Sequence, residues 1–250
     1  MKRVKTGIKG FDELVQGGLP EGASILVTGS PGTGKSIFGL QFLFNGATKF
    51  HEKGLYVSFE QLKKDIVNQA SQFGWDMMKL EREKKIEILC IPITKVTQDT
   101  VIMIKNKIKK EKIKRVVIDS LTTLTVNAPI YSMTKDLTIK DVVNDNTVFS
   151  PPIVGDFLVK HFIYSFIEGL QEFETVTTIL ISENSTEPGY MSRDTVSEFA
   201  CDGVILINFE SLGGDYSRSL IVRKMRQTKN DEDVHPVEIS EHGIVVHQLK

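Results

Sequence analysis

The distribution of apolar residues predicts alternating strands and helices along most of the chain. Short apolar runs rich in β-branched side chains are typical of strands buried on both faces of a sheet. Five such runs span Ile25 to Thr28, Leu55 to Phe59, Arg115 to Ile118, Thr178 to Ser182 and Gly203 to Ile207. Apolar residues at helical spacing predict helices over Ser36 to Thr48, Leu62 to Phe73 and Phe157 to Phe173. This alternation indicates an α/β fold whose mostly parallel, twisted sheet is covered by helices on both faces.

The pattern changes in two parts of the chain. Ser219 to Met225 and Val237 to His247 are predicted as shorter strands, the second containing a turn, and they suggest a short antiparallel extension near the C-terminus. Val126 to Asp156 has no periodicity and is rich in Thr, Asn, Asp and Ser. We therefore predict one domain over residues 1–250 with an irregular insertion at about 126–156, which is either a solvated loop or a partner-binding or gating segment.

Composition excludes several classes of protein and favours a cytoplasmic one. The 250 residues carry a net charge of -1, which provides no global attraction to nucleic acid or anionic membranes. No window approaches the roughly 18 apolar residues of a membrane-spanning helix, and the N-terminus does not resemble a signal peptide. Cys90 and Cys201 are far apart in mostly apolar surroundings, as expected for free thiols in a reducing compartment.

A glycine-rich segment between the first predicted strand and helix matches the phosphate-loop pattern at every fixed position. The segment consists of Gly29, Ser30, Pro31, Gly32, Thr33, Gly34, Lys35 and Ser36. Its glycines allow backbone N–H groups to surround phosphates, Lys35 reaches the β- and γ-phosphates, and the Ser36 hydroxyl ligates Mg²⁺. We add Ile37, the next residue, to the nucleotide-binding set. The sequence therefore predicts a site for ATP and Mg²⁺.

Acidic and polar residues follow three other predicted strands. Because ligands of an open parallel sheet bind at the carboxyl ends of its strands, these residues are candidates for the same site. Asp119 resembles a Walker B aspartate that holds Mg²⁺. Glu60 could polarise the water that attacks the γ-phosphorus, or could instead be a solvated residue near the next helix. Glu183 and Asn184 occupy the usual place of a polar residue that senses the γ-phosphate.

Together these motifs resemble the KaiC family of the RecA-like P-loop ATPases, of which RadA-like proteins are relatives. The resemblance covers nearly the whole chain. It includes the segments Thr6 to Leu14, Gly17 to Pro20, Phe59-Glu60, Phe73 to Asp76, Val196 to Ile207, His235 to Ile239 and Gly243 to Val246. By resemblance, subunits form a ring, usually a hexamer, with ATP held between neighbours. Lys224 and Arg226 then match the basic pair that acts across the interface, and Arg218 lies at a position typical of a nucleotide contact.

The chain departs from the family in three respects. Clock-type members have two ATPase domains in tandem, whereas this sequence has one. The family often has two consecutive glutamates after its second strand, and here Gln61 follows Glu60. The insertion at 126–156 is longer than is usual, so the family implies no role for it.

Three functions are compatible with these features. The favoured one is a ring-forming ATPase that couples hydrolysis to conformational signalling in an unidentified protein partner, with Ser or Thr autophosphorylation implied by resemblance. A nucleic-acid motor or recombination accessory is less favoured, because the lysine-rich run Lys105 to Arg115 lacks aromatic residues and is typical of a solvated helix face. The third is a non-hydrolysing, ATP-gated scaffold, which remains compatible with the sequence because Gln61 replaces the second glutamate.

Overall fold

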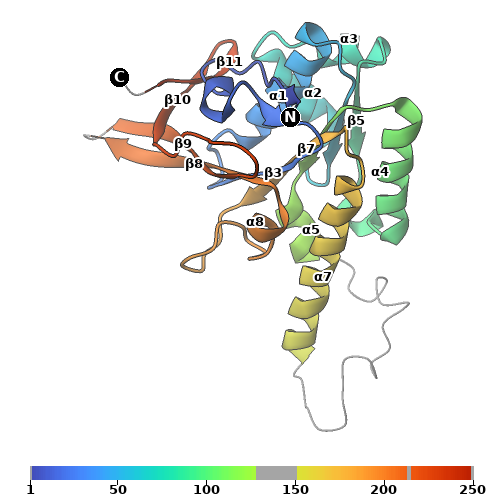
Figure 1. Cartoon of the computed structure of the whole chain (residues 1–250). Coiled ribbons are helices and arrows are strands. Elements are labelled where there is room, and N and C mark those ends of the chain that lie inside the picture. Colours follow the sequence, from blue (N-terminus) through green and yellow to red (C-terminus); the bar gives the residue numbers. More distant parts are fainter. Residues whose placement is uncertain (1, 128–150, 213–214, 249–250) are drawn as a thin grey trace.

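The computed structural model describes residues 2–127, 151–212 and 215–248 (Figure 1). Its centre is a nine-stranded mixed sheet in the order β11-β10-β9-β8-β3-β7-β6-β4-β5. A separate two-stranded sheet pairs β1 (Arg3–Val4) with β2 (Leu19–Pro20). The predicted α/β architecture is therefore confirmed.

Six neighbouring strands of the large sheet are mutually parallel. They are β3 (Ser24–Gly29), β4 (Gly54–Ser58), β5 (Ile86–Cys90), β6 (Arg115–Asp119), β7 (Thr177–Glu183) and β8 (Gly203–Leu212). Five of them are the predicted strands. The sixth, β5, was missed because Glu87 interrupts its apolar run, as a strand at the sheet edge permits.

Helices cover both faces of the sheet. The helices are α1 (Lys35–Lys49), α2 (Lys63–Ser71), α3 (Met77–Arg82), α4 (Gln98–Glu111), α5 (Leu121–Asn127), α7 (Pro151–Gln171) and α8 (Ser197–Ala200), with 3₁₀ turns at Asp12–Val15 and Ile93–Lys95. Successive residues of a strand point to opposite faces, so Ile25 and Val27 join one hydrophobic core and Leu26 joins the other. None of the described helices is long and apolar enough to cross a membrane.

The predicted boundaries of the irregular segment were wrong at both ends. Val126 lies in α5, and residues from Pro151 to Asp156 form the first turns of α7. Proline is tolerated in the first turn of a helix because the N–H groups there have no partner within the helix. Pro151 and Pro152 therefore begin a helix rather than extend a loop. Residues 128–150 lie outside the described residues.

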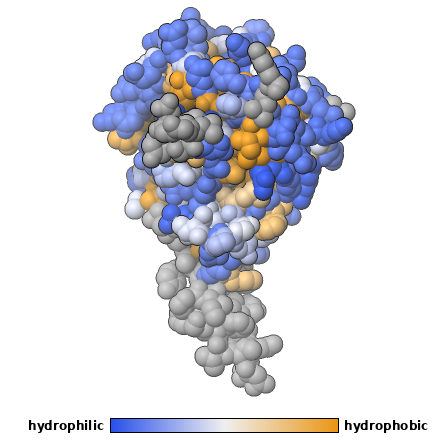
Figure 2. All heavy atoms as spheres, turned by 90° about the vertical axis from the view of Figure 1, so that its left-hand side faces the viewer, coloured by the Kyte–Doolittle hydropathy of each residue, from blue (hydrophilic) through white to orange (hydrophobic). Residues whose placement is uncertain are grey.

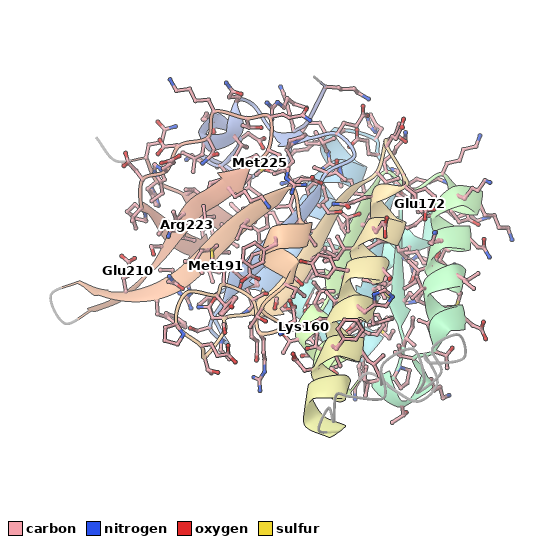
Figure 3. The ribbon with its side chains drawn as sticks, turned by 60° about the horizontal axis from the view of Figure 1, so that its bottom comes forward. Lys160, Glu172, Met191, Glu210, Arg223 and Met225 are labelled. Atoms are coloured by element: carbon pink, nitrogen blue, oxygen red, sulfur yellow. The ribbon has the colours of Figure 1, made fainter. Side chains whose placement is uncertain are left out.

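The C-terminal strands extend the sheet in antiparallel fashion, as predicted. β9 (Asp215–Met225) pairs with β8, β10 (His235–Ser240) pairs with β9, and β11 (Gly243–Val246) closes this edge. β8 and β9 form a hairpin that projects from the body, with Glu210 towards its free end and Met225 where it joins the body (Figure 3). On this side of the molecule, apolar residues come to the surface among hydrophilic ones (Figure 2).

One buried cation fastens β6 to α1 and to the N-terminal segment. The Arg115 side chain is 1% exposed and lies over the Phe42 ring, 4.6 Å from its centroid. Its guanidinium donates to the Phe42 carbonyl at 2.9 Å, the Lys5 carbonyl at 2.8 Å and the Glu52 carboxylate at 2.7 Å. These contacts satisfy the charge that burial would otherwise penalise.

Replacing this cation should destabilise the fold without touching the nucleotide site. Arg115→Met keeps much of the apolar volume but leaves Glu52 and two carbonyl groups without their donor. We expect a loss of about 3 kcal/mol in the free energy of unfolding, measured by urea denaturation. Arg82→Met, at an exposed position at the end of α3, is the control and should change stability by less than about 0.5 kcal/mol. Equal stability of the two variants would contradict this role of Arg115.

Candidate nucleotide-binding site

The predicted phosphate loop connects β3 to α1 and is held in place by close backbone contacts. A Cβ atom on Gly29 would lie 2.0 Å from the Ile207 carbonyl oxygen, so only glycine fits there. Gly34 has a φ of 106° and directly precedes α1, a conformation that favours glycine. Ile37, in the first turn of α1, is half-buried and packs against one core. The loop therefore presents its N–H groups and the positive end of α1 to the same side.

Lys35 is buried within its own loop. Its ammonium group donates to the carbonyl oxygens of Gly29 at 2.8 Å and Ser30 at 2.9 Å. Burial lowers its pKa, while the charges of Glu183, Asp119 and Glu60, in decreasing order, act in the opposite direction. The lysine thus lies close to three carboxylates at the carboxyl ends of β4, β6 and β7.

Ser36 and Asp119 are in direct contact, as their predicted shared role in Mg²⁺ binding requires. The Ser36 hydroxyl donates to Asp119 Oδ2 at 2.8 Å, and the Tyr56 hydroxyl donates to the same oxygen at 2.5 Å. Burial raises the pKa of Asp119, and the two hydroxyl donors partly offset this effect. One carboxylate and one hydroxyl fit Mg²⁺, which usually keeps several waters and takes further oxygens from bound phosphates.

Within the described part of the chain, no group of three or more His, Cys, Asp or Glu side chains could hold a metal ion. The Ser36–Asp119 pair therefore suits a cation that arrives with a phosphate ligand, not one held by a protein cage.

Glu60, the candidate general base, is exposed at the end of β4 but is anchored by hydroxyl groups. Its Oε1 accepts a hydrogen bond from the Ser120 hydroxyl at 2.6 Å and another from Thr123. Sequence reasoning missed Ser120, Thr123 and Tyr56. The hydroxyls that follow Asp119 were a usable signal, because Ser120 directly follows β6 and Thr123 lies in the first turn of α5.

Two polar residues at the carboxyl end of β7, Glu183 and Asn184, lie at the same end of the sheet. Arg193 donates to Glu183 Oε2 at 3.1 Å, and the Thr28 hydroxyl donates to Asn184 Oδ1 at 3.0 Å. Asn184 is thereby fixed to the last residues of β3, beside the phosphate loop. These contacts place both residues where the sequence suggested a phosphate-sensing group.

The three basic candidates from the C-terminal strands fall into two locations. Arg218 pairs with Phe209 in the hairpin, stacks over its ring at 5.0 Å and donates to the Gly32 carbonyl at 3.4 Å. It therefore lies against the phosphate loop of its own subunit. Lys224 pairs with Val204, which in turn pairs with Leu26, near the start of β3.

Lys224 and Arg226 are thus not brought to the phosphate loop of the same chain. The Lys224 ammonium group donates to the carbonyls of Cys201 at 2.6 Å and Glu198 at 2.9 Å. Arg226 donates to the Asp202 carboxylate at 3.1 Å. Burial, and secondly the charge of Arg226, lower the pKa of Lys224. Both cations therefore line the opposite end of the strands.

The strand order gives the class of protein. A phosphate loop after β3 and a Walker B-type aspartate as the last residue of β6, with β7 between these two strands in the sheet, define a RecA-like P-loop NTPase core. A sequence model of the family described as "ATPase: KaiC" matches residues 4–137 and 127–250. The chain belongs to the KaiC ATPase family.

Individual relatives agree with this assignment. The UPF0273 protein MJ1359 of Methanocaldococcus jannaschii is 34% identical over 100% of this chain and 98% of its own. The circadian clock oscillator protein KaiC of Parasynechococcus marenigrum is 32% identical, and this chain spans only 45% of its length. The crystal structure of the KaiC-like protein PH0186 from Pyrococcus horikoshii OT3 has a TM-score of 0.80 at 32% identity, covering 99% of both chains.

The burial of Asp119 predicts a conflict between stability and binding. Since its folded-state pKa is raised above 3.8, the ionised carboxylate destabilises the fold at neutral pH, and this penalty vanishes below the unfolded pKa. Nucleotide-free Asp119→Asn should therefore melt at a higher temperature than the wild type at pH 7.5. Each 1 kcal/mol corresponds to about 2–4 °C for a chain of this size. The difference should shrink as the pH falls towards 4.

Differential scanning fluorimetry at several pH values checks this prediction. Asp65→Asn, at an exposed position in the first turn of α2, is the matched control and should not melt at a higher temperature. A lower melting temperature of Asp119→Asn at pH 7.5 would show that its hydrogen bonds outweigh its burial.

Proposed function

We propose that this protein is a Mg²⁺-dependent ATPase that hydrolyses ATP between the subunits of a ring and couples hydrolysis to conformational signalling in a protein partner. The observation that carries the proposal is the anchored Glu60 carboxylate, held by Ser120 beside the Ser36–Asp119 pair. A nucleotide-binding scaffold needs the loop and the aspartate, but it has no need for a fixed carboxylate facing solvent at the phosphate end of the sheet. Membership of the KaiC ATPase family supports the same conclusion.

Each residue has a distinct task in this mechanism. The loop N–H groups and Lys35 bind the phosphates, with Lys35 exchanging the carbonyls of Gly29 and Ser30 for phosphate oxygens. Ser36 and Asp119 would hold Mg²⁺, which supplies neutralisation of charge on the β- and γ-phosphates. Glu60 accepts a proton from, and orients, the attacking water. Ser120 and Thr123 keep Glu60 in the position that this step requires.

A second subunit would complete the site. Charge that develops on the γ-phosphate needs a cation, and Lys35 is the one from the loop itself. Because Lys224 and Arg226 lie at the far end of their own strands, they can serve only the site of a neighbouring subunit. An arginine delivered in this way contributes about 10³–10⁵ in rate. The apolar surface on the side of the hairpin is suited to such an interface (Figure 2).

Two alternatives have weaker support. A nucleic-acid-binding function would use the basic run of α4, but Lys105 is paired with Glu172 at 2.7 Å and Lys107 with Glu87 at 2.6 Å. A non-hydrolysing scaffold is favoured by Gln61, because the family often has a second glutamate at this position. The backbone N–H of Gln61 donates to the Ser58 hydroxyl at 2.9 Å. Autophosphorylation of a serine or threonine is part of the proposal without an assigned residue, and phosphopeptide mass spectrometry after incubation with ATP tests it.

Glu60→Gln should bind ATP normally and lose turnover, because the amide cannot accept the proton of the water. We expect kcat to fall about 10²–10⁴-fold with an unchanged Kd for ATP. Steady-state ATPase assays and fluorescent-nucleotide titration measure the two quantities. Glu241→Gln, in the exposed turn between β10 and β11, is the control with the same chemical change.

Hydroxyl variants add a second comparison. Ser120→Ala with Thr123→Val keeps the Glu60 carboxylate but removes the two hydroxyl groups that anchor it. The kcat should therefore fall less than in Glu60→Gln, with KM unchanged. Full activity of Glu60→Gln would exclude Glu60 as the general base and favour the scaffold.

Complementation tests the inter-subunit cation. Lys35→Ala should not bind ATP, and Arg226→Ala should bind ATP but hydrolyse it about 10³–10⁵-fold more slowly. Mixing the two variants creates interfaces that join a competent loop to an intact Arg226, and random mixing should restore about a quarter of wild-type activity. ATPase assays on the separate and mixed proteins measure this. Mixtures as inactive as the separate variants would place Arg226 outside the site.

A further inference from the structure

A cavity lies at the end of the sheet opposite the phosphate loop. It has a volume of about 350 Å³ and is lined by Lys2, Lys53, Lys112 and Lys114. Lys53 directly precedes β4 and Lys114 directly precedes β6, so the cavity opens at the amino ends of the strands whose carboxyl ends lead to Glu60 and Asp119. Three separate parts of the chain thus bring four lysines to one hollow, where His51 adds another cation when protonated.

The carboxylates of this cavity are already engaged. Glu21 is paired with Lys2 at 2.5 Å, and Glu52 is paired with the buried Arg115 at 2.7 Å. Glu172, which directly follows α7 (Figure 3) and does not line the cavity, is paired with Lys105 at 2.7 Å. Among the described residues, no hydrogen bond or ion pair holds the ammonium groups of Lys53, Lys112 and Lys114. Three cations therefore face the cavity without a partner carboxylate.

Helix ends account for only part of this charge. α1 ends at Lys49 and α4 at Glu111, next to the cavity, and each C-terminus carries roughly half a negative charge. Together these partial charges offset about one of the three positive charges of the unpaired lysines. Lys109 and Lys110 in the last turn of α4 already serve the end of that helix. About two positive charges remain for a ligand.

A neighbouring cavity shows that the excess is local. It has a volume of about 360 Å³, shares Lys53 and is lined by Lys84 and Lys107 together with Glu81, Glu87 and Glu111. Lys107 is paired there with Glu87 at 2.6 Å. The second cavity is thus lined by as many glutamates as lysines, whereas the first, of similar volume, has four lysines and two glutamates, of which Glu52 is paired with Arg115.

The backbone that carries the two central lysines is fixed by hydrogen bonds. The Lys114 N–H donates to the Lys53 carbonyl at 2.9 Å, and the Thr177 N–H donates to the Lys114 carbonyl at 3.0 Å. Lys53 and Lys114 are half-buried, so their stems are partly confined by the surrounding surface. Such a preformed arrangement lowers the entropic cost of holding an anion.

We propose that this cavity binds a small anion carrying two or more phosphate groups. Lysine ammonium groups bind phosphate as point charges, and three of them around one hollow suit a multiply charged ligand rather than a single carboxylate. A volume of about 350 Å³ matches a small-molecule site, at the lower end of the usual range. The proposal does not depend on ATP hydrolysis at the other end of the sheet.

Isothermal titration calorimetry with inorganic pyrophosphate tests the proposal. Lys35→Ala is the background, so that the phosphate loop does not contribute. Adding Lys53→Gln and Lys114→Gln should weaken pyrophosphate binding at least tenfold. The matched control is Lys109→Gln with Lys110→Gln, which removes the same charge near the same helix end outside the cavity and should weaken binding less than twofold. If the first pair impairs folding, judged by circular dichroism, Lys112→Gln replaces it, because Lys112 is exposed.

The outcomes separate a specific site from general charge. Absence of pyrophosphate binding, or equal weakening by both pairs of substitutions, would overturn the proposal. A short single-stranded oligonucleotide forms the second arm of the experiment. If the oligonucleotide binds with the same dependence on Lys53 and Lys114 while pyrophosphate does not, the cavity is a nucleic-acid contact and not a small-molecule site.

Discussion

The buried carboxylate of Asp119 connects the parts of the molecule on which the nucleotide site depends. It accepts hydrogen bonds from Ser36, at the start of α1, and from Tyr56, within β4. Three strands or helices that are distant in sequence are thereby held at one point of the sheet. Because burial disfavours the charge, the fold maintains Asp119 at a cost in stability, as is common where binding requires a group in an unfavourable environment.

The two ends of the sheet carry different functional residues. Its carboxyl end carries the phosphate loop, Glu60 and Asp119, whereas Lys224 and Arg226 lie near the start of the strands, held by the segment around Cys201 and Asp202. A single subunit therefore contains both halves of the proposed catalytic machinery without bringing them together. Under the proposed mechanism, this separation would make assembly a requirement for hydrolysis, and a partner that alters the ring would alter the rate.

The sequence revealed the fold and the loop because their signals are local. Apolar runs marked five of the six parallel strands, and the phosphate loop needs consecutive residues to form its anion nest. The anchoring of Glu60 could not be predicted from consecutive residues, since Ser120 and Thr123 follow β6, which only the folded sheet places beside β4. Pro151 and Pro152 are typical of a loop in sequence, although a helix can begin with proline, as α7 does. The basic cavity depends on Lys2, Lys53 and Lys114, which only the folded chain brings together.

The most direct test of hydrolysis between subunits is a cryo-electron microscopy structure of the protein with Mg²⁺ and a non-hydrolysable ATP analogue. We predict a ring in which the γ-phosphate lies between Lys35 of one subunit and Arg226 of its neighbour, with Glu60 facing the side from which water attacks. A monomer, or a ring in which Arg226 stays on Asp202 away from the nucleotide, would contradict hydrolysis between subunits and leave a nucleotide-binding scaffold as the explanation.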